Sequence, residues 1–263
     1  RRVNSSDETD SIREKTFTDI NQRIGLWRVF DERAPDSISD TEIRAFIKSK
    51  NLSGTSQKNY LRHLSIFFRW CIDHGYGSTN PVEKIKIKQR RKDPKIYEPN
   101  EVISIFEKSK EIYPDIIPYF ALAFFAGVRP DEIMRMSWED INWKRNVISI
   151  SASTSKTNSS RNVLIKPNLK SWLKKHESTG KIFPHSESTL KRKRASIYKA
   201  AEVSTIQDGA RHSFATFYYA LEGLEKTIDA LGHSSSEMLL KHYKSQIVGR
   251  EEEAKEFFGI NSL

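Results

Sequence analysis

The sequence predicts a mainly α-helical protein with a small antiparallel β-sheet, arranged as two domains. Apolar residues recur at helical spacing through most of the chain, and two short β-branched segments flank a polar turn. A basic segment bounded by prolines separates two regions that each have their own apolar pattern. With 263 residues, of which 37% are hydrophobic, the chain is long enough to bury a substantial core.

The first domain is predicted as a helical bundle over residues 14–88, after a polar lead-in of residues 1–13 that lacks apolar periodicity. Ser39 and Glu42 form a capping-box pattern, in which each side chain satisfies a free backbone donor at the start of a helix. The apolar positions of the three expected helices are Phe17, Ile20, Ile24 and Trp27, then Ile43, Phe46 and Ile47, then Tyr60, Leu64, Phe67, Phe68 and Cys71.

A basic linker is predicted at residues 89–97. It overlaps a run of lysines and arginines that begins after Pro81 and extends to Lys95. Such a run is a solvated tether as readily as a phosphate contact, and composition gives the two interpretations equal weight. The candidates for DNA contact in this region are Lys86, Lys88, Arg90, Arg91 and Lys92.

The second domain is predicted over residues 98–250, followed by a tail at 251–263. Asn100 is expected to cap its first helix, and a strongly apolar helix follows and ends at Phe125. Two strands are expected at residues 147–150 and 163–165, as a hairpin with a polar tip. Further helices are expected at residues 168–176, 188–201, 209–221, 223–231 and 236–246.

The charge of the chain points to a polyanionic partner. Lys and Arg number 44 against 34 Asp and Glu, a formal net charge of +10, so double-stranded DNA is the first candidate. Charge alone leaves membrane surfaces and acidic proteins open. The longest apolar stretch, residues 116–128, is interrupted by Pro118 and too short to cross a bilayer, so no membrane partner is expected.

No cofactor and no metal site are expected from the motifs. The single cysteine, Cys71, forms no internal disulfide or cysteine-built metal cluster, which fits a reducing compartment. No paired-carboxylate or histidine cluster has the spacing of a metal nuclease, and no glycine-rich loop with a following lysine indicates a nucleotide site. The chain begins at Arg1 without methionine, which leaves room for a preceding segment.

Two segments place arginines where the backbone is locally constrained. They are Ala126-Gly127-Val128-Arg129-Pro130-Asp131-Glu132 and Asp208-Gly209-Ala210-Arg211-His212-Ser213-Phe214-Ala215-Thr216. A phosphodiester repels nucleophiles, so a metal-free enzyme must bring fixed cations to its non-bridging oxygens, and the planar guanidinium suits this task best. Each arginine alone has an ordinary interpretation, Arg129 as an ion-pair partner at a helix start and Arg211 as a surface residue.

Together with Leu231-Gly232-His233 and Lys241-His242-Tyr243, these segments resemble the signature boxes of the tyrosine recombinase (phage integrase) family. The resemblance covers the chain from about residue 98 onward, and the helical first domain with its linker resembles the family's core-binding (SAM-like) DNA-binding domain. The positions that match the family's catalytic residues are, in chain order, Arg129, Lys156, Arg211, His233 and Tyr243.

The resemblance implies metal-independent DNA strand transfer. In that chemistry Tyr243 attacks the scissile phosphate, forms a 3′-phosphotyrosyl bond and frees a 5′ hydroxyl that can later reverse the step. Arg129 and Arg211 would hold the non-bridging oxygens, and His233 would add a hydrogen bond. Lys156 would protonate the leaving oxygen. Glu132, one helical turn after Arg129, is expected to orient that arginine.

Two features depart from the family pattern. Asp208 stands three residues before Arg211, where members usually have histidine, and an aspartate there would accept the tyrosine proton or orient Arg211. The separation of His233 and Tyr243 is one residue longer than is common. His212 is interpreted as a scaffold residue beside Arg211.

Several candidates keep a plainer alternative. Lys156 lies in a polar hairpin where solvated lysines are common. A second basic run comprises Lys191, Arg192, Lys193 and Arg194. If the chain has the predicted fold, this run is equally well interpreted as a solvated helix face or as a DNA contact.

The expected function is site-specific DNA recombination, integration or excision, by a homo-tetramer on two DNA sites, with the 251–263 tail docking on a neighbouring protomer. The expected location is the cytoplasm, at the nucleoid, for a bacterial or phage-encoded protein. Two alternatives stay open: a DNA-binding regulator derived from an integrase, with catalysis impaired by Asp208, and a type IB topoisomerase-like relaxing enzyme.

Overall fold

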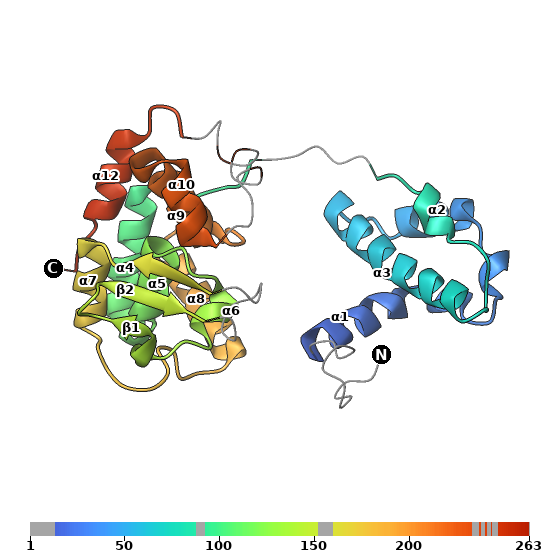
Figure 1. The fold of residues 1–263 in the computed structure, drawn as a ribbon, viewed down its shortest axis with the longest axis horizontal. Coiled ribbons are helices and arrows are strands. Elements are labelled where there is room, and N and C mark those ends of the chain that lie inside the picture. Colours follow the sequence, from blue (N-terminus) through green and yellow to red (C-terminus); the bar gives the residue numbers. More distant parts are fainter. Residues whose placement is uncertain are drawn as a thin grey trace. The chain divides into compact units, whose positions relative to one another are not determined.

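The chain divides into two compact units, residues 1–91 (unit 1) and 92–263 (unit 2), shown in Figure 1. The structure is a computed structural model and describes residues 14–87, 93–151, 160–232, 237, 240, 243 and 247–262. Within these residues no helix is both long and apolar enough to cross a membrane. The predicted class is confirmed, since helices dominate and the sheet has three antiparallel strands.

The described part of unit 1 is a bundle of three α-helices. Two 3₁₀ turns lie between the first and second helix, and a third follows the last helix. Its core contains Trp27, Ile43, Leu64 and Phe68, all buried. The capping box at Ser39 is present: its hydroxyl accepts from the backbone N–H of Glu42, whose carboxylate accepts from the N–H of Ser39. The elements are α1 (Glu14–Ile24), η1 (Gly25–Phe30), η2 (Pro35–Ser37), α2 (Asp40–Ser49), α3 (Gly54–Asp73) and η3 (Pro81–Lys84).

Unit 2 is built around α5, whose nine residues are all buried. Helices α7, α9 and α4 pack on it, so α9 is held against the centre of the core. The helical elements are α4 (Pro99–Ile112), η4 (Pro114–Ile116), α5 (Ile117–Phe125), α6 (Pro130–Ile133), η5 (Trp138–Asp140), α7 (Pro167–Lys174), α8 (Glu187–Ala200), α9 (Gly209–Glu222), α10 (Leu224–Leu231) and α12 (Glu251–Gly259).

The sheet has the order β1 (Ile141–Asn142), β2 (Val147–Ile150), β3 (Arg161–Leu164). The predicted β2–β3 hairpin is confirmed, and β3 begins two residues earlier than predicted because Ile150 pairs with Arg161. Burial alternates along β3, so the Arg161 side chain lies on the same inner face as Val163.

The start of α4 and the C-terminal segment also differ from the sequence prediction. The cap of α4 is Glu98 rather than Asn100, because Pro99 suits the first helical position and Glu101 accepts from the N–H of Glu98 at 2.9 Å. The segment expected as a tail is instead α12, packed on α9 and α4 of its own unit with Phe257 fully buried. Its docking on a neighbouring protomer stays a proposal.

Candidate active site

Arg129 stands at a turn that only glycine permits. Gly127 has φ +60°, and a Cβ there would lie 2.3 Å from Cδ1 of the Phe214 ring on α9. Pro130 then opens α6, and the N–H of Arg129 donates to the Glu132 carboxylate at 3.1 Å. The tight approach between this turn and α9 brings the first arginine box close to the second.

Glu132 is fully buried and binds two arginines. Its Oε1 accepts from Nη1 of Arg129 at 3.1 Å and from Nη1 of Arg161 at 3.1 Å, and its Oε2 accepts from Nη2 of Arg161 at 2.6 Å. Burial by itself raises the pKa of Glu132, but the bonds and charge of Arg161, with those of Arg129, outweigh burial and lower the pKa to about 2. Glu132 is therefore the anionic centre that holds both guanidinium groups, which agrees with the orienting role expected from its position.

Arg161 is a site residue that the motif analysis missed. Its Nε also donates to the carbonyl of Ala230 at 3.1 Å, so one guanidinium joins β3, α6 and the end of α10. Gly232 has φ +62°, and a Cβ there would lie 2.7 Å from Cδ of Arg161. The sequence does contain a signal, because Arg161 is two residues before Val163 and so shares its inward face.

Arg211 lies on α9 and is 8% exposed. Its Nη1 donates to the carbonyl of Gly127, and its Nη2 donates to the carbonyl of Leu231 at 2.7 Å. Burial, with the positive charges of Arg129 and Arg161, lowers the pKa of Arg211 to about 9. Three arginines near one carboxylate form a site with excess positive charge, which suits an anion such as phosphate.

Tyr243 is 5% exposed, and its hydroxyl lies 2.5 Å from Nδ1 of His212. Burial raises the pKa of the phenol to about 12, against the opposing charge of Arg211, and the charge of Asp208 adds to the increase. The hydroxyl is therefore protonated near neutral pH. The sequence predicts a scaffold role for His212. In the structure its Nδ1 forms a hydrogen bond with this hydroxyl.

Asp208 is the N-cap residue of α9, in the left-handed conformation with φ +52°, and its side chain makes no capping hydrogen bond. It acts on Tyr243 through its charge, which opposes formation of a phenolate. The structure thus places the predicted residues Arg129, Glu132, Asp208, Arg211 and Tyr243 in one site. Lys156 and His233 lie outside the described residues.

The four basic residues 191–194 of α8 differ in exposure, because they point in different directions around the helix. Lys191 and Arg192 are exposed, but Lys193 is 8% exposed and its ammonium bonds to Asp115. Arg194 lies between the rings of Tyr119 and Tyr198, 5.8 and 5.6 Å from their centroids. The charged groups of Lys193 and Arg194 thus have contacts within unit 2, and their contact with DNA stays a prediction.

Of the basic residues near the predicted linker, Lys86 is exposed and lines a groove of about 390 Å³ in unit 1 together with Lys58 and Arg62. The other candidates, Lys88, Arg90, Arg91 and Lys92, lie outside the described residues.

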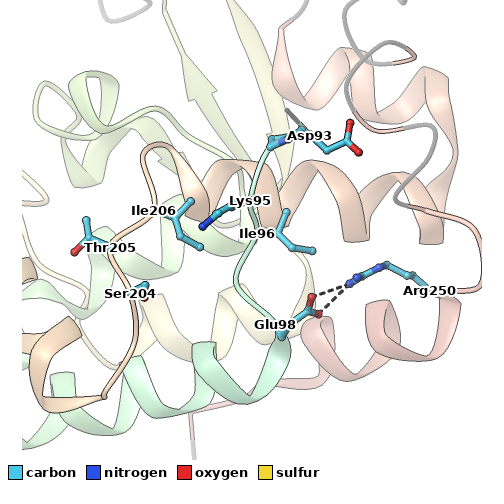
Figure 2. A pocket seen from close by; sticks show the side chains of 9 residues that line it. Asp93, Lys95, Ile96, Glu98, Ser204, Thr205, Ile206 and Arg250 are labelled. Atoms are coloured by element: carbon cyan, nitrogen blue, oxygen red, sulfur yellow. Dashed lines mark hydrogen bonds and ion pairs between the residues drawn. The ribbon is translucent and has the colours of Figure 1, made fainter. Parts of the chain in front are cut away.

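A second hollow lies apart from the arginine cluster. Figure 2 shows this hollow of about 430 Å³, lined by the first residues of unit 2, by residues 204–206 and by Arg250, whose guanidinium binds Glu98 at 2.9 and 3.1 Å. None of the candidate catalytic residues lines it. The ion pair of Arg250 and Glu98 connects the start of α12 to the start of α4, which is a structural role.

Comparison with protein families supports the motif analysis. A model of the phage integrase family matches residues 97–247. The integrase of Escherichia phage HK022 is 27% identical over 137 residues, which is 50% of this chain and 38% of the relative. A protein of Escherichia coli strain K12 described as the defective protein IntQ is 27% identical over 105 residues, 40% of this chain and 26% of the relative. The matches span well under two thirds of these relatives' length.

Solved structures share the fold. A lambda integrase dimer bound to a core DNA site has a TM-score of 0.73 at 21% identity, covering 88% of this chain and 92% of that chain. A lambda integrase tetramer bound to a Holliday junction has a TM-score of 0.72 at 21% identity, covering 87% and 74%.

Proposed function

The chain belongs to the phage integrase family of tyrosine recombinases, and from this membership we propose that it cuts and rejoins double-stranded DNA at specific sites. The observation that carries the proposal is the buried cluster in which Glu132 holds Arg129 and Arg161 beside Arg211 and the hydroxyl of Tyr243. The start of α6 supplies Arg129 and Glu132, β3 supplies Arg161 and α9 supplies Arg211. Their convergence supports an anion site next to the proposed nucleophile, Tyr243.

In the proposed reaction Tyr243 attacks the scissile phosphate and becomes joined to the 3′ side of the break, while the 5′ oxygen leaves as a hydroxyl. Arg129 and Arg211 bind the non-bridging oxygens. Without an anion the arginines repel one another. Burial is the main cause of the lowered pKa of Arg211, and the charges of Arg129 and Arg161 add to it. A phosphate relieves that repulsion, and the relief grows as negative charge accumulates in the transition state.

The remaining roles are proposed for residues 156 and 233. Lys156 protonates the leaving 5′ oxygen, and His233 donates a hydrogen bond to the phosphate. Because the phosphotyrosyl bond keeps the energy of the broken bond, a 5′ hydroxyl from a partner strand can attack it and complete strand exchange.

Unit 1 is proposed as the core-binding domain and unit 2 as the catalytic domain. Exposed cations contact the DNA backbone in this proposal, including Lys86 in unit 1 and Lys191 and Arg192 on α8. The lambda integrase structures contain a dimer on DNA and a tetramer on a Holliday junction. By analogy we propose a homo-tetramer acting on two DNA sites.

A covalent trapping experiment tests the proposal. Duplexes that bind the protein are first selected from a random-sequence pool and are then nicked near each candidate cleavage position, so that a short product diffuses away and cleavage is not reversed. We expect a protein–DNA adduct on a denaturing gel, formed in EDTA and absent with Tyr243→Phe. Absence of any adduct with the unmodified protein, despite tight binding, would contradict the proposal.

A second candidate function is a DNA-binding regulator that has lost catalysis. Asp208 in place of the usual histidine favours it, as does the similarity to a relative described as defective. The trapping experiment separates the two, because both proteins bind DNA and only the recombinase forms the adduct. A relaxing enzyme of the topoisomerase IB type would form the adduct but would not join strands from two duplexes.

A further inference from the structure

His212 contacts the reacting atom of the proposed nucleophile. Its Nδ1 lies 2.5 Å from the Tyr243 hydroxyl oxygen, and the two rings are 5.9 Å apart at 45°. This distance is within the range of a strong hydrogen bond. If His212 served only to pack beside Arg211, it would not need a hydrogen bond to the Tyr243 hydroxyl.

We propose that His212 is the general base of the cleavage step, in place of the histidine that this chain lacks at position 208. This inference rests on the proposed function and deepens it. As the Tyr243 oxygen forms its bond to phosphorus, the phenolic proton passes to Nδ1 of His212, and the bond from phosphorus to the 5′ oxygen breaks. The leaving oxygen takes its proton from Lys156, so one proton is donated and one is accepted in each step.

The geometry of α9 explains how one helix carries both the phosphate-binding Arg211 and the proposed base His212. Consecutive helical residues point about 100° apart, so Arg211 and His212 face different partners of the same site. The Arg211 guanidinium donates to the carbonyls of Gly127 and Leu231. The side chain of His212 leaves the helix in a different direction from that of Arg211. With Nδ1 as the acceptor, neutral imidazole carries its proton on Nε2.

The contact with the hydroxyl favours His212 over Asp208 as the base. A phenol with a pKa of about 12 is ionised in only roughly one molecule in 10⁵ at pH 7, so attack benefits from a base in contact with the hydroxyl. The negative charge of Asp208 opposes ionisation of Tyr243. Neutral imidazole carries no such charge, and it already lies at hydrogen-bonding distance from the hydroxyl.

The test compares His212→Asn and His212→Ala with the unmodified protein. Asparagine keeps an oxygen that can accept the hydrogen bond but does not take up a proton near neutral pH, so it separates positioning from proton transfer. The matched control is His176→Asn, a half-buried histidine of unit 2 just beyond α7. Noncovalent binding to the selected duplex and thermal unfolding are measured first for every variant.

We expect both His212 variants to form the covalent adduct at least about 10²-fold more slowly, with DNA binding unchanged. Free imidazole in the buffer should restore part of the rate of His212→Ala, which a purely structural role would not allow. A substrate with sulfur in place of the bridging 5′ oxygen has a leaving group that needs no proton. It should rescue Lys156→Ala and leave His212→Asn slow.

Other outcomes overturn the inference. An unchanged rate for His212→Asn excludes proton transfer to His212, and a faster rate indicates that the histidine restrains the tyrosine. Rescue of His212→Asn by the sulfur substrate would make His212 an acid toward the leaving group. If the His212→Ala variant does not fold, the rate of adduct formation by His212→Asn decides whether His212 accepts the proton. If the unmodified protein forms no adduct, the proposed function fails as well, whereas failure of the inference alone leaves that adduct intact.

Discussion

Glu132 shows how one buried side chain organises the candidate site. A carboxylate without exposed surface is costly unless it is paired, and here two guanidinium groups supply the pairing. In turn the arginines need Glu132, because three positive side chains would otherwise repel one another within a small volume. Residue identity at position 132 therefore affects both stability and phosphate binding.

Replacing Glu132 by Gln is expected to lower the free energy of unfolding by about 3–5 kcal/mol near pH 7, because it breaks a buried ion pair and leaves the guanidinium charges uncompensated. Denaturant titration of the variant and the unmodified protein measures this. Glu256→Gln is the control, since Glu256 is exposed on α12, and a small change is expected there. A Glu132→Gln variant as stable as the unmodified protein would contradict the assignment.

The same pair of proteins has a predicted pH dependence. The pKa of Glu132 falls from an ordinary 4.5 to about 2 in the folded protein, so its stabilising effect is complete above pH 4.5 and is lost as pH falls through about 2. The unfolding free energies of the unmodified protein and Glu132→Gln should therefore converge toward pH 2. Parallel curves over this range would show that ionised Glu132 is not the stabilising species.

At the scale of elements, the site depends on how closely the turn before α6 approaches α9. Gly127 allows a positive φ and close packing on the Phe214 ring, and its carbonyl then receives the Arg211 guanidinium. The hairpin contributes Arg161 from the inner face of β3, and Gly232 leaves space for that side chain. Two glycines thus determine the spacing between the arginine-bearing elements.

Gly127→Ala and Gly180→Ala form a matched pair that separates strain from collision. Both glycines have positive φ, +60° and +73°, but a Cβ at Gly127 would lie 2.3 Å from a ring carbon whereas one at Gly180 meets no atom within 4 Å. We expect Gly180→Ala to cost about 1 kcal/mol, from backbone conformation alone. Gly127→Ala should cost more and should slow adduct formation, because α9 must shift with Arg211. Equal losses of stability in the two variants would contradict the predicted collision.

At the scale of the whole molecule, the net charge of +10 favours DNA, but the fold decides which cations remain available. On α8, Lys191 and Arg192 face outward, whereas Lys193 binds Asp115 and Arg194 lies between two tyrosine rings. Each unit has its own core.

The double variant Lys191→Ala, Arg192→Ala is expected to weaken DNA binding. The slope of log K against log salt concentration should become shallower by about 0.9 for each DNA phosphate that the variant no longer neutralises. Its stability should change little. Lys193→Met is the matched control. It removes one partner of Asp115, whose other partner is His185, and should lower stability with a smaller change in the salt slope. Fluorescence anisotropy at several salt concentrations measures both, and an unaltered slope in the double variant would exclude phosphate binding through this face.

Local sequence patterns were sufficient for the fold class, the β2–β3 hairpin and the positions of α7 to α10 within two residues, because periodic burial and turn chemistry are local properties. They also predicted Arg129, Glu132, Arg211 and Tyr243 as site residues, because these ordered motifs are specific as a set. The catalytic roles of these residues stay a prediction. The folded chain was needed to reveal the contact of Arg161 with Glu132, the contact of His212 with Tyr243, and the contacts of Lys193 and Arg194 within unit 2. The physical reason is that these roles depend on partners 29 to 78 positions away in the chain. Local patterns do not encode which distant group will lie within hydrogen-bonding distance.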